Sequence, residues 1–99
     1  MSAATDSLED VIRYFFARAL SRDDVGRDDN FFELGGYSLL IFQLVGCLEE
    51  LFGLEVPLKV LFEAPTPAEF TQLLRTQLVV NNVAVDEILA KWDAAHPKG

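Results

Sequence analysis

The chain has 99 residues, of which 51% are hydrophobic and 24% charged, and its formal net charge is −8. This length allows one small domain with a single modest core and excludes two domains. The acidic balance argues against nucleic acid or an anionic membrane as a partner and favours proteins that present basic patches.

No apolar window approaches the length that crosses a bilayer, and the N-terminal residues lack the basic and apolar regions of a signal peptide. We therefore expect a cytoplasmic protein. The lone Cys47 permits no intrachain disulfide, and the sequence has no Cys/His cluster suited to zinc.

A first amphipathic helix is predicted over residues 8–20, because apolar residues recur there with helical spacing. Asp6 and Ser7 are suitable N-caps, and Glu9 follows Asp6 at the spacing of a capping box. The helical pattern stops over residues 21–37, where we expect a long loop anchored by its apolar residues. Those anchors are Val25, Phe31, Phe32 and Leu34. A loop of this length in a compact domain usually carries function.

A second helix is predicted over residues 38–52, ended by Gly53 in the left-handed conformation with Leu54 packed back. Its sequence is apolar nearly all round. Leu39 and Phe42 are expected to remain at the surface, where they indicate a protein-binding site. The core members are expected to be Leu44, Val45, Leu48 and Leu51.

Residues 57–63 form a further short segment, predicted to be one or two helical turns. Thr66, Pro67 and Glu69 then give a strong helix start, with an N-cap, a proline in the first turn and a capping box. The buried stripe of that helix is predicted to be Phe70, Leu73, Leu74 and Leu78. A last amphipathic segment carries Val85, Ile88, Leu89 and Trp92 on one face. It is either a loosely ordered linker or, as we favour, a helix that docks weakly.

Ser38 is the residue best placed for chemistry, since it lies at the predicted N-terminus of a helix, where a phosphoryl group is favoured. A hydrolase is a weaker interpretation. The residue after Leu39 is not the glycine of a nucleophile elbow, and no strand pattern precedes the serine. The only histidine, His96, lies in the polar C-terminal tail.

Residues 31–40 read Phe-Phe-Glu-Leu-Gly-Gly-Tyr-Ser-Leu-Leu. This segment resembles the phosphopantetheine attachment motif of carrier domains, in the form found in the peptidyl carrier (thiolation) domains of nonribosomal peptide synthetases. The resemblance continues through residues 43–45, 54–58 and 61–66 and covers roughly residues 8–78. It implies an all-α, four-helix acyl-carrier-like bundle with a possible extra C-terminal helix. Residues 1–80 would form the carrier domain and residues 81–99 a C-terminal extension or linker.

The resemblance also implies how the protein works. A phosphopantetheinyl transferase would move 4'-phosphopantetheine from coenzyme A onto Ser38, and the arm would carry aminoacyl or peptidyl thioesters. Adenylation, condensation and thioesterase-type domains, or tailoring enzymes, would be its partners. The domain itself would be a non-catalytic monomer without a metal.

The serine helix has no acid before Glu49, so we expect mainly apolar recognition. The predicted partner contacts are Tyr37, Leu39, Phe42, Leu58, Lys59 and Phe62. Tyr37 stands where the family more often has His, Asp or Asn, and Ile41 and Phe42 are larger than usual. We expect Cys47 in or near the core. Solvated charge rather than a calcium loop is expected for Asp23, Asp24, Asp28 and Asp29.

Two alternatives remain open from the sequence. The first is a carrier of acyl or aryl groups in a polyketide or hybrid pathway. The second is a helical adaptor that only resembles a carrier and binds another helix through Leu39 and Phe42.

Overall fold

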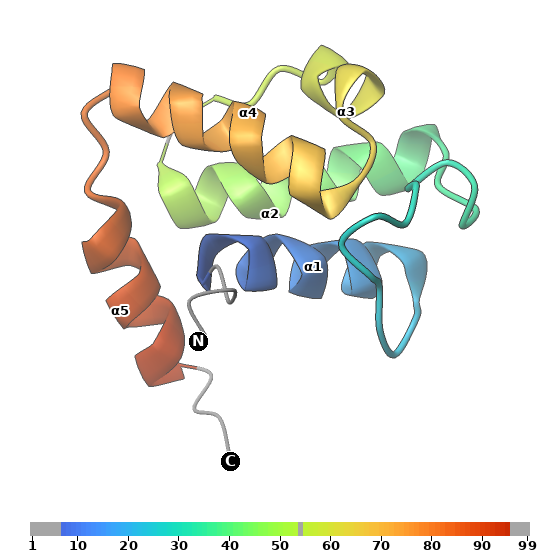
Figure 1. Ribbon diagram of the computed structural model, residues 1–99, viewed down its shortest axis with the longest axis horizontal. Coiled ribbons are helices and arrows are strands. Elements are labelled where there is room, and N and C mark those ends of the chain that lie inside the picture. The colour runs from blue at the N-terminus through green and yellow to red at the C-terminus, as the bar shows by residue number, and fades with distance from the viewer. Residues whose placement is uncertain (1–6, 54, 96–99) are drawn as a thin grey trace.

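The computed structural model describes residues 7–53 and 55–95, which contain five α-helices and no strand. The helices are α1 (Ser7–Leu20), α2 (Ser38–Phe52), α3 (Lys59–Glu63), α4 (Pro67–Val80) and α5 (Val85–Ala95). Helices α2 and α4 both pack on α1, while α5 crosses the end of the bundle that lies opposite the start of α2 (Figure 1). The all-α prediction is confirmed. No helix in the described ranges is both long enough and apolar enough to span a membrane.

Three fully buried phenylalanines form the centre of the core. The ring of Phe16 on α1 makes edge contacts with Phe31 of the following loop and with Phe70 on α4, at centroid distances of 5.4 and 5.7 Å. Helix α2 adds a set of buried residues, namely Ile41, Leu44, Val45, Leu48 and Phe52. Burial of each large apolar side chain stabilises the fold by about 1.5–3 kcal/mol before conformational entropy is subtracted.

The predicted core is wrong at Leu73 and only partly right at Leu51. Leu73 is 37% exposed, because it lies about 100° around α4 from its buried neighbour Leu74. Thr71, at the other edge of the buried stripe of α4, is buried instead. On α2, Leu51 is only half-buried. The helical period therefore identifies these faces correctly but misjudges their width.

The helix ends follow the predicted capping signals where the structure describes them. Gly53 ends α2 with φ 70°, and its N–H donates to the carbonyl of Glu49. At the start of α4, the Thr66 hydroxyl accepts from the backbone N–H of Glu69 at 3.2 Å and donates to its carboxylate at 3.0 Å. The expected roles of Asp6 and Leu54 lie outside the described residues.

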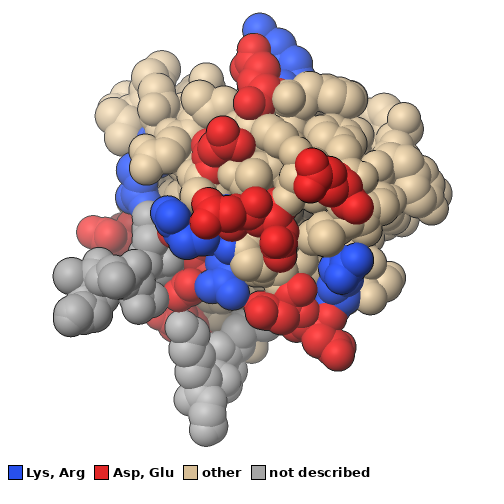
Figure 2. Space-filling view, turned by 45° about the vertical axis from the view of Figure 1, so that its right-hand side comes forward, with Lys and Arg blue, Asp and Glu red and all other residues tan. Residues whose placement is uncertain are grey.

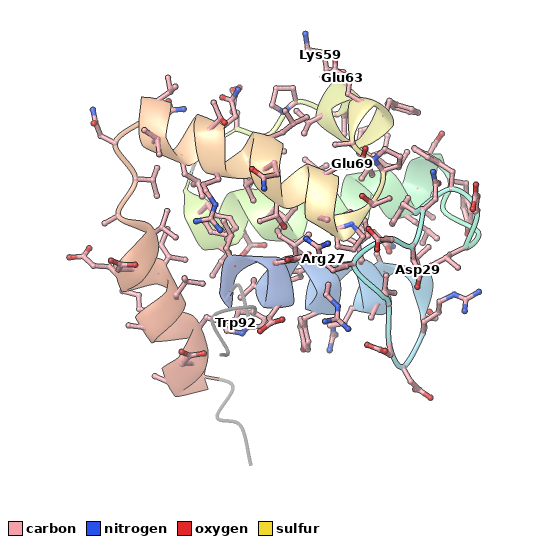
Figure 3. The ribbon with its side chains drawn as sticks, in the orientation of Figure 1. Arg27, Asp29, Lys59, Glu63, Glu69 and Trp92 are labelled. Atoms are coloured by element: carbon pink, nitrogen blue, oxygen red, sulfur yellow. The ribbon has the colours of Figure 1, made fainter. Side chains whose placement is uncertain are left out.

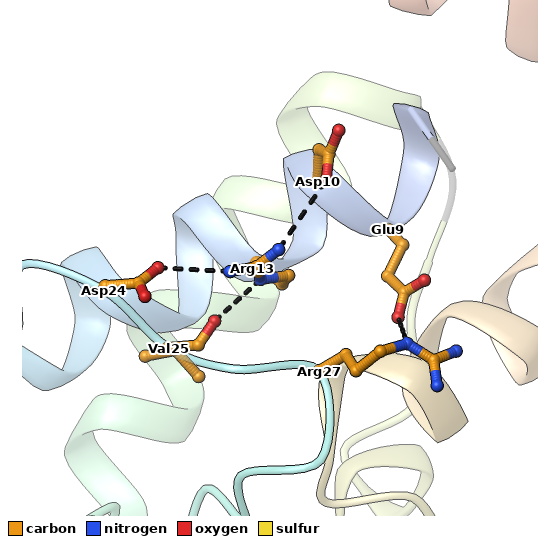
Figure 4. Close-up of polar contacts among 6 residues, drawn as sticks. All are labelled: Glu9, Asp10, Arg13, Asp24, Val25 and Arg27. Atoms are coloured by element: carbon orange, nitrogen blue, oxygen red, sulfur yellow. Dashed lines mark hydrogen bonds and ion pairs between the residues drawn. The ribbon is translucent and has the colours of Figure 1, made fainter. Parts of the chain in front are cut away.

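The first half of the loop between α1 and α2 is tied to α1 by polar contacts (Figure 4). Arg13 on α1 donates from Nε to the Val25 carbonyl at 2.7 Å and from Nη2 to Asp24 at 3.2 Å. Arg27 pairs with Glu9 at 2.7 Å, and the Glu9 side chain is only 11% exposed. These bonds fix the first half of the loop, so its second half starts from a defined position.

Phe31 anchors the second half of this loop. Its N–H donates to the Pro65 carbonyl at 2.8 Å, and its own carbonyl accepts from Gly36 at 2.9 Å. A Cβ atom on Gly36 would overlap the Phe31 ring and lie 2.7 Å from the Phe31 carbonyl oxygen. Only glycine allows the chain to pass this closely over the buried ring. Its neighbour Gly35 adopts φ 101°, which also favours glycine.

We predict that Gly36→Ala lowers the free energy of unfolding by about 1–3 kcal/mol, because the new methyl group overpacks the Phe31 site. Gly46→Ala is the matched control. A Cβ atom there meets nothing within 4 Å, so the helix propensity of alanine should stabilise α2 by about 0.5–1 kcal/mol. Urea unfolding followed by circular dichroism measures both changes. Equal effects of the two substitutions would contradict the close approach at Gly36.

Helix α5 docks on α1 mainly through Trp92. Its ring lies 4.9 Å from the Tyr14 ring and 5.2 Å from the Phe15 ring, between centroids (Figure 3). Val85 and Ile88 pack against the edge of the core, but no residue of α5 is fully buried. An 11-residue helix is marginal by itself in water, so α5 depends on this small contact. The predicted C-terminal helix is present, and its contact with the bundle is small.

Trp92 is the only tryptophan, so its fluorescence reports the docking of α5. We predict that Tyr14→Ala shifts the Trp92 emission to longer wavelength and raises the accessibility of Trp92 to acrylamide, because the contact with the Tyr14 ring is lost. The free energy of unfolding should fall by no more than about 1.5 kcal/mol, since Tyr14 is 36% exposed. Replacement of the other tyrosine, Tyr37→Ala, should leave the emission unchanged. An unshifted spectrum in Tyr14→Ala would contradict the docked position of α5.

Candidate functional site

Ser38 is the first residue of α2 and is exposed to solvent. The preceding Tyr37 has an extended backbone, with φ −144° and ψ 177°, and its carbonyl accepts the helical hydrogen bond from Ile41 at 3.0 Å. The chain therefore enters the helix at Ser38, as predicted, with the serine hydroxyl at the helix N-terminus and open to a second protein.

The N-terminus of α2 is left open by its own sequence. Tyr37 makes no side-chain capping hydrogen bond, and the first turn holds no acidic residue. The first backbone N–H groups of a helix have no partner within it, and the helix dipole makes this end positive. Helix α4 differs, because Thr66 and Glu69 cap it. The start of α2 thus suits a phosphoryl group on Ser38.

The turn before Ser38 is held by one side chain. The Asn30 Oδ1 atom accepts from the backbone N–H groups of Phe32 at 2.8 Å and Glu33 at 3.2 Å. The Leu34 N–H then donates to the Asn30 carbonyl at 3.1 Å. These bonds close a compact turn above Phe31. The position of Ser38 is therefore defined by the core rather than by a free loop.

Exposed apolar side chains stand on both sides of Ser38 in the chain and one helical turn after it. We call four of them the apolar collar, with exposed fractions of 57–61%: Tyr37, Leu39, Phe42 and Phe62. Phe62 on α3 stacks on Phe32 of the loop at 5.2 Å between centroids and 17° between planes. The collar therefore joins α2, the loop and α3 into one surface. Most of the predicted contact residues are thus accessible.

The remaining predicted contacts differ in exposure. Lys59 is exposed and extends away from the bundle at the top of α3 (Figure 3), whereas Leu58 is half-buried. Of the two enlarged residues on α2, Ile41 is buried and serves the core, while Phe42 is 60% exposed. Packing in the core therefore explains the size of Ile41. The large side chain of Phe42 remains on the surface, where a partner can contact it.

Charged groups on this side of the molecule are mostly acidic (Figure 2). Red carboxylates spread over the middle and lower part of the view, with blue groups among them, and uncharged surface covers much of the right-hand side, while further charged side chains project at the top. Two of the loop acids have structural partners, since Asp24 pairs with Arg13 and Asp29 accepts from the Gly26 N–H at 2.8 Å. Within residues 7–53 and 55–95, the His, Cys, Asp and Glu side chains form no group of three that could hold a metal ion.

The prediction that Cys47 lies in or near the core is wrong, because the residue is exposed. It follows Leu39 and Gln43 at intervals of four residues, so these three side chains share one face of α2. The predicted exposure of Leu39 is confirmed, and its spacing to Cys47 is the signal that places Cys47 correctly. The hydrolase candidate His96 lies outside the described residues.

Comparison with known proteins places this geometry in a family. The family described as "Phosphopantetheine attachment site" matches residues 10–74. A linear gramicidin synthase of Brevibacillus parabrevis is 52% identical over 66 residues, which are 67% of this chain and 1% of that protein. This chain thus spans a very small part of the curated relatives it matches.

Solved structures agree with the sequence relatives. BlmI, a type-II acyl carrier protein from Streptomyces verticillus involved in bleomycin biosynthesis, aligns with a TM-score of 0.70 at 35% identity, covering 73% of this chain and 87% of BlmI. A peptidyl carrier protein in complex with the phosphopantetheine transferase Sfp and coenzyme A aligns with a TM-score of 0.69 at 32% identity. That alignment covers 73% of this chain and 94% of the other. The chain therefore belongs to the phosphopantetheine attachment-site family and is a carrier domain of the nonribosomal peptide synthetase type.

Proposed function

We propose that Ser38 is the attachment residue for 4'-phosphopantetheine and that the domain carries aminoacyl or peptidyl groups between the enzymes of a peptide synthetase. The observation that carries this proposal is the exposed Ser38 hydroxyl at the uncapped start of α2. The backbone N–H groups and the dipole of that helix end stabilise the phosphodiester charge. When attached, the group supplies a terminal thiol that holds acyl groups as thioesters.

Ser38 needs help from a second protein to be modified. Its oxygen forms a bond to the phosphorus that bears pantetheine in coenzyme A, the pyrophosphate bond at that phosphorus breaks, and adenosine 3',5'-bisphosphate leaves. The hydroxyl proton must pass to a base. In this proposal a phosphopantetheinyl transferase supplies the base. The domain itself is a substrate and a carrier, not a catalyst.

The partners follow from this role. They are a transferase, and then adenylation, condensation and thioesterase-type domains or tailoring enzymes that meet a monomeric, cytoplasmic carrier. Covalent attachment gives the cargo a high effective concentration at each partner site. The collar supplies apolar contact area for all of them, and residues 1–80 form the unit that they recognise.

The first prediction of this proposal concerns the mass of the protein. Incubation with coenzyme A and a broad-specificity transferase should add one phosphopantetheinyl group, and Ser38→Ala should abolish the addition. Ser21→Gly is the control, because it removes another exposed hydroxyl at a position with φ 56° that glycine accepts. Intact-protein mass spectrometry measures the result. An unmodified wild-type chain would overturn the proposal and favour a helical adaptor.

The second prediction concerns recognition by the collar. Phe42→Ala should lower kcat/KM for the transferase by about tenfold, because a truncated interface anchor costs more than about 1 kcal/mol. Val80→Ala is the matched control. Val80 is 71% exposed, but it lies at the end of α4, on the side of the bundle opposite Ser38 (Figure 1).

The rate of coenzyme A consumption measures both variants, with Ser38 intact in each. Charge reversal tests the competing idea that acidic groups guide recognition. If Asp28→Lys or Glu33→Lys slowed the transfer more than Phe42→Ala did, recognition would be mainly electrostatic, and the apolar role of the collar would be wrong.

A further inference from the structure

A groove of about 250 Å³ runs between α1 and α2, outside the apolar collar. Its α1 wall consists of Phe15, Arg18 and Ala19, and its α2 wall of Gln43, Leu44 and Cys47. Arg18, Gln43 and Cys47 are exposed, so the groove opens to solvent, while the fully buried Leu44 forms part of its floor.

The groove is continuous with the start of α2. Leu39, Gln43 and Cys47 follow one another at intervals of four residues, so a single exposed face leads from the residue after Ser38 into the groove. The groove residues of α2 come five to nine positions after Ser38. At the rise of an α-helix, this places them about 8–14 Å along the axis from the serine.

The phosphopantetheine arm has a matching length. Its chain from the serine oxygen to the sulfur contains about as many atoms as the backbone of five residues, so it reaches about 17 Å when extended. An arm lying along the Leu39 face would bring its thiol to the region of Cys47. The tether also raises the local concentration of the arm to the millimolar range, so even a shallow groove can hold it.

The chemistry of the groove also matches the arm. The arm carries a geminal dimethyl group, a hydroxyl and two amides, and therefore needs an apolar floor with hydrogen-bonding groups at the rim. Phe15, Ala19 and Leu44 give the apolar surface, while the Gln43 amide and the Arg18 guanidinium stand at the open side. The Phe15 ring is supported by Trp92 at 5.2 Å, so α5 helps to fix one wall.

We propose that the groove between α1 and α2 is a resting site for the outer part of the phosphopantetheine arm, with the arm's thiol beside Cys47. This inference rests on the proposed attachment at Ser38. It assigns separate roles to the collar and to the groove. Partners contact the collar, and the arm lies in the groove when no partner holds it.

The test uses Cys47 as a reporter in the modified protein, whose mass is verified first. Oxidised glutathione is then added. A disulfide between the arm and Cys47 forms as the two thiols give up two protons and two electrons, and one glutathione disulfide is reduced to two glutathione thiols. Mass spectrometry should show a monomer that has lost two hydrogens and carries no glutathione. The effective molarity of the arm thiol at Cys47 is calculated from the ratio of disulfide to dithiol protein at known concentrations of oxidised and reduced glutathione.

The control variant combines Cys47→Ser with Glu63→Cys. Glu63 is exposed on α3 (Figure 3) and does not line the groove, so it offers an exposed cysteine on another helix of the same domain. We expect the effective molarity of the arm thiol to be at least about tenfold higher at Cys47 in the wild type than at the cysteine of the Glu63→Cys variant. Ala19→Leu, which narrows the groove, should reduce the value at Cys47 while Ser38 is still modified at the normal rate.

Three results would overturn the proposal. An equal or lower effective molarity at Cys47, or only mixed disulfides with glutathione, would show that the arm does not rest in the groove. An Ala19→Leu value equal to that of the wild type would place the arm elsewhere on α2. Failure to modify Ser38 would appear in the mass before any oxidant is added, and would overturn the attachment itself.

Discussion

The site depends on one close approach, in which Gly36 passes over the buried ring of Phe31. Phe31 is fixed from below by its edge contact with Phe16 and from the side by its hydrogen bond to the Pro65 carbonyl. Because the backbone of Gly36 lies directly on this ring, the core determines where α2 begins. Ser38 follows two residues later, so its position is defined although the residue is exposed. A serine on a free loop would cost each partner the entropy of ordering that loop, whereas this one is ordered before any partner arrives.

The two long helices that follow the loop show how stability and function diverge. Helix α4 has an N-cap and a capping acid, whose removal typically costs about 1 kcal/mol. Helix α2 begins with Tyr37, which caps nothing, and with no acid in its first turn. An acidic cap there would stabilise the free protein but would repel a phosphoryl group bound to Ser38. Under the proposed attachment, α2 lacks a cap at the helix end that receives the phosphoryl group, and the attached group supplies that interaction.

Much of this arrangement could be predicted from the sequence, because the signals involved are local. The span of α2, the turn at Gly53, the start of α4 at Thr66 and the exposure of Leu39 and Phe42 all follow from spacing and capping rules. The errors arise where neighbouring helices decide the outcome. Leu73 lies at the edge of an otherwise apolar face, and the packing of α4 on α1 determines whether that edge is covered. Cys47 is different, because its spacing from the exposed Leu39 already indicates an exposed position. The groove beside Cys47 could not be predicted at all, since its walls come from residues nearly thirty positions apart that meet only through the packing of α1 on α2.

A carrier must release its arm to every partner, and this limits how strong any resting site can be. A tenfold preference for the groove corresponds to about 1.4 kcal/mol, which a partner site with a few well-placed contacts can exceed easily. The shape of the groove suits such a weak site, because it is open on one side and its polar groups stand at the rim, where water competes with them. Helix α5 also affects how firmly the groove can hold the arm. Trp92 supports Phe15, so displacement of this weakly docked helix would loosen one wall without disturbing the core around Phe31. The segment that follows the four-helix bundle can therefore influence the arm from the end of the molecule opposite Ser38.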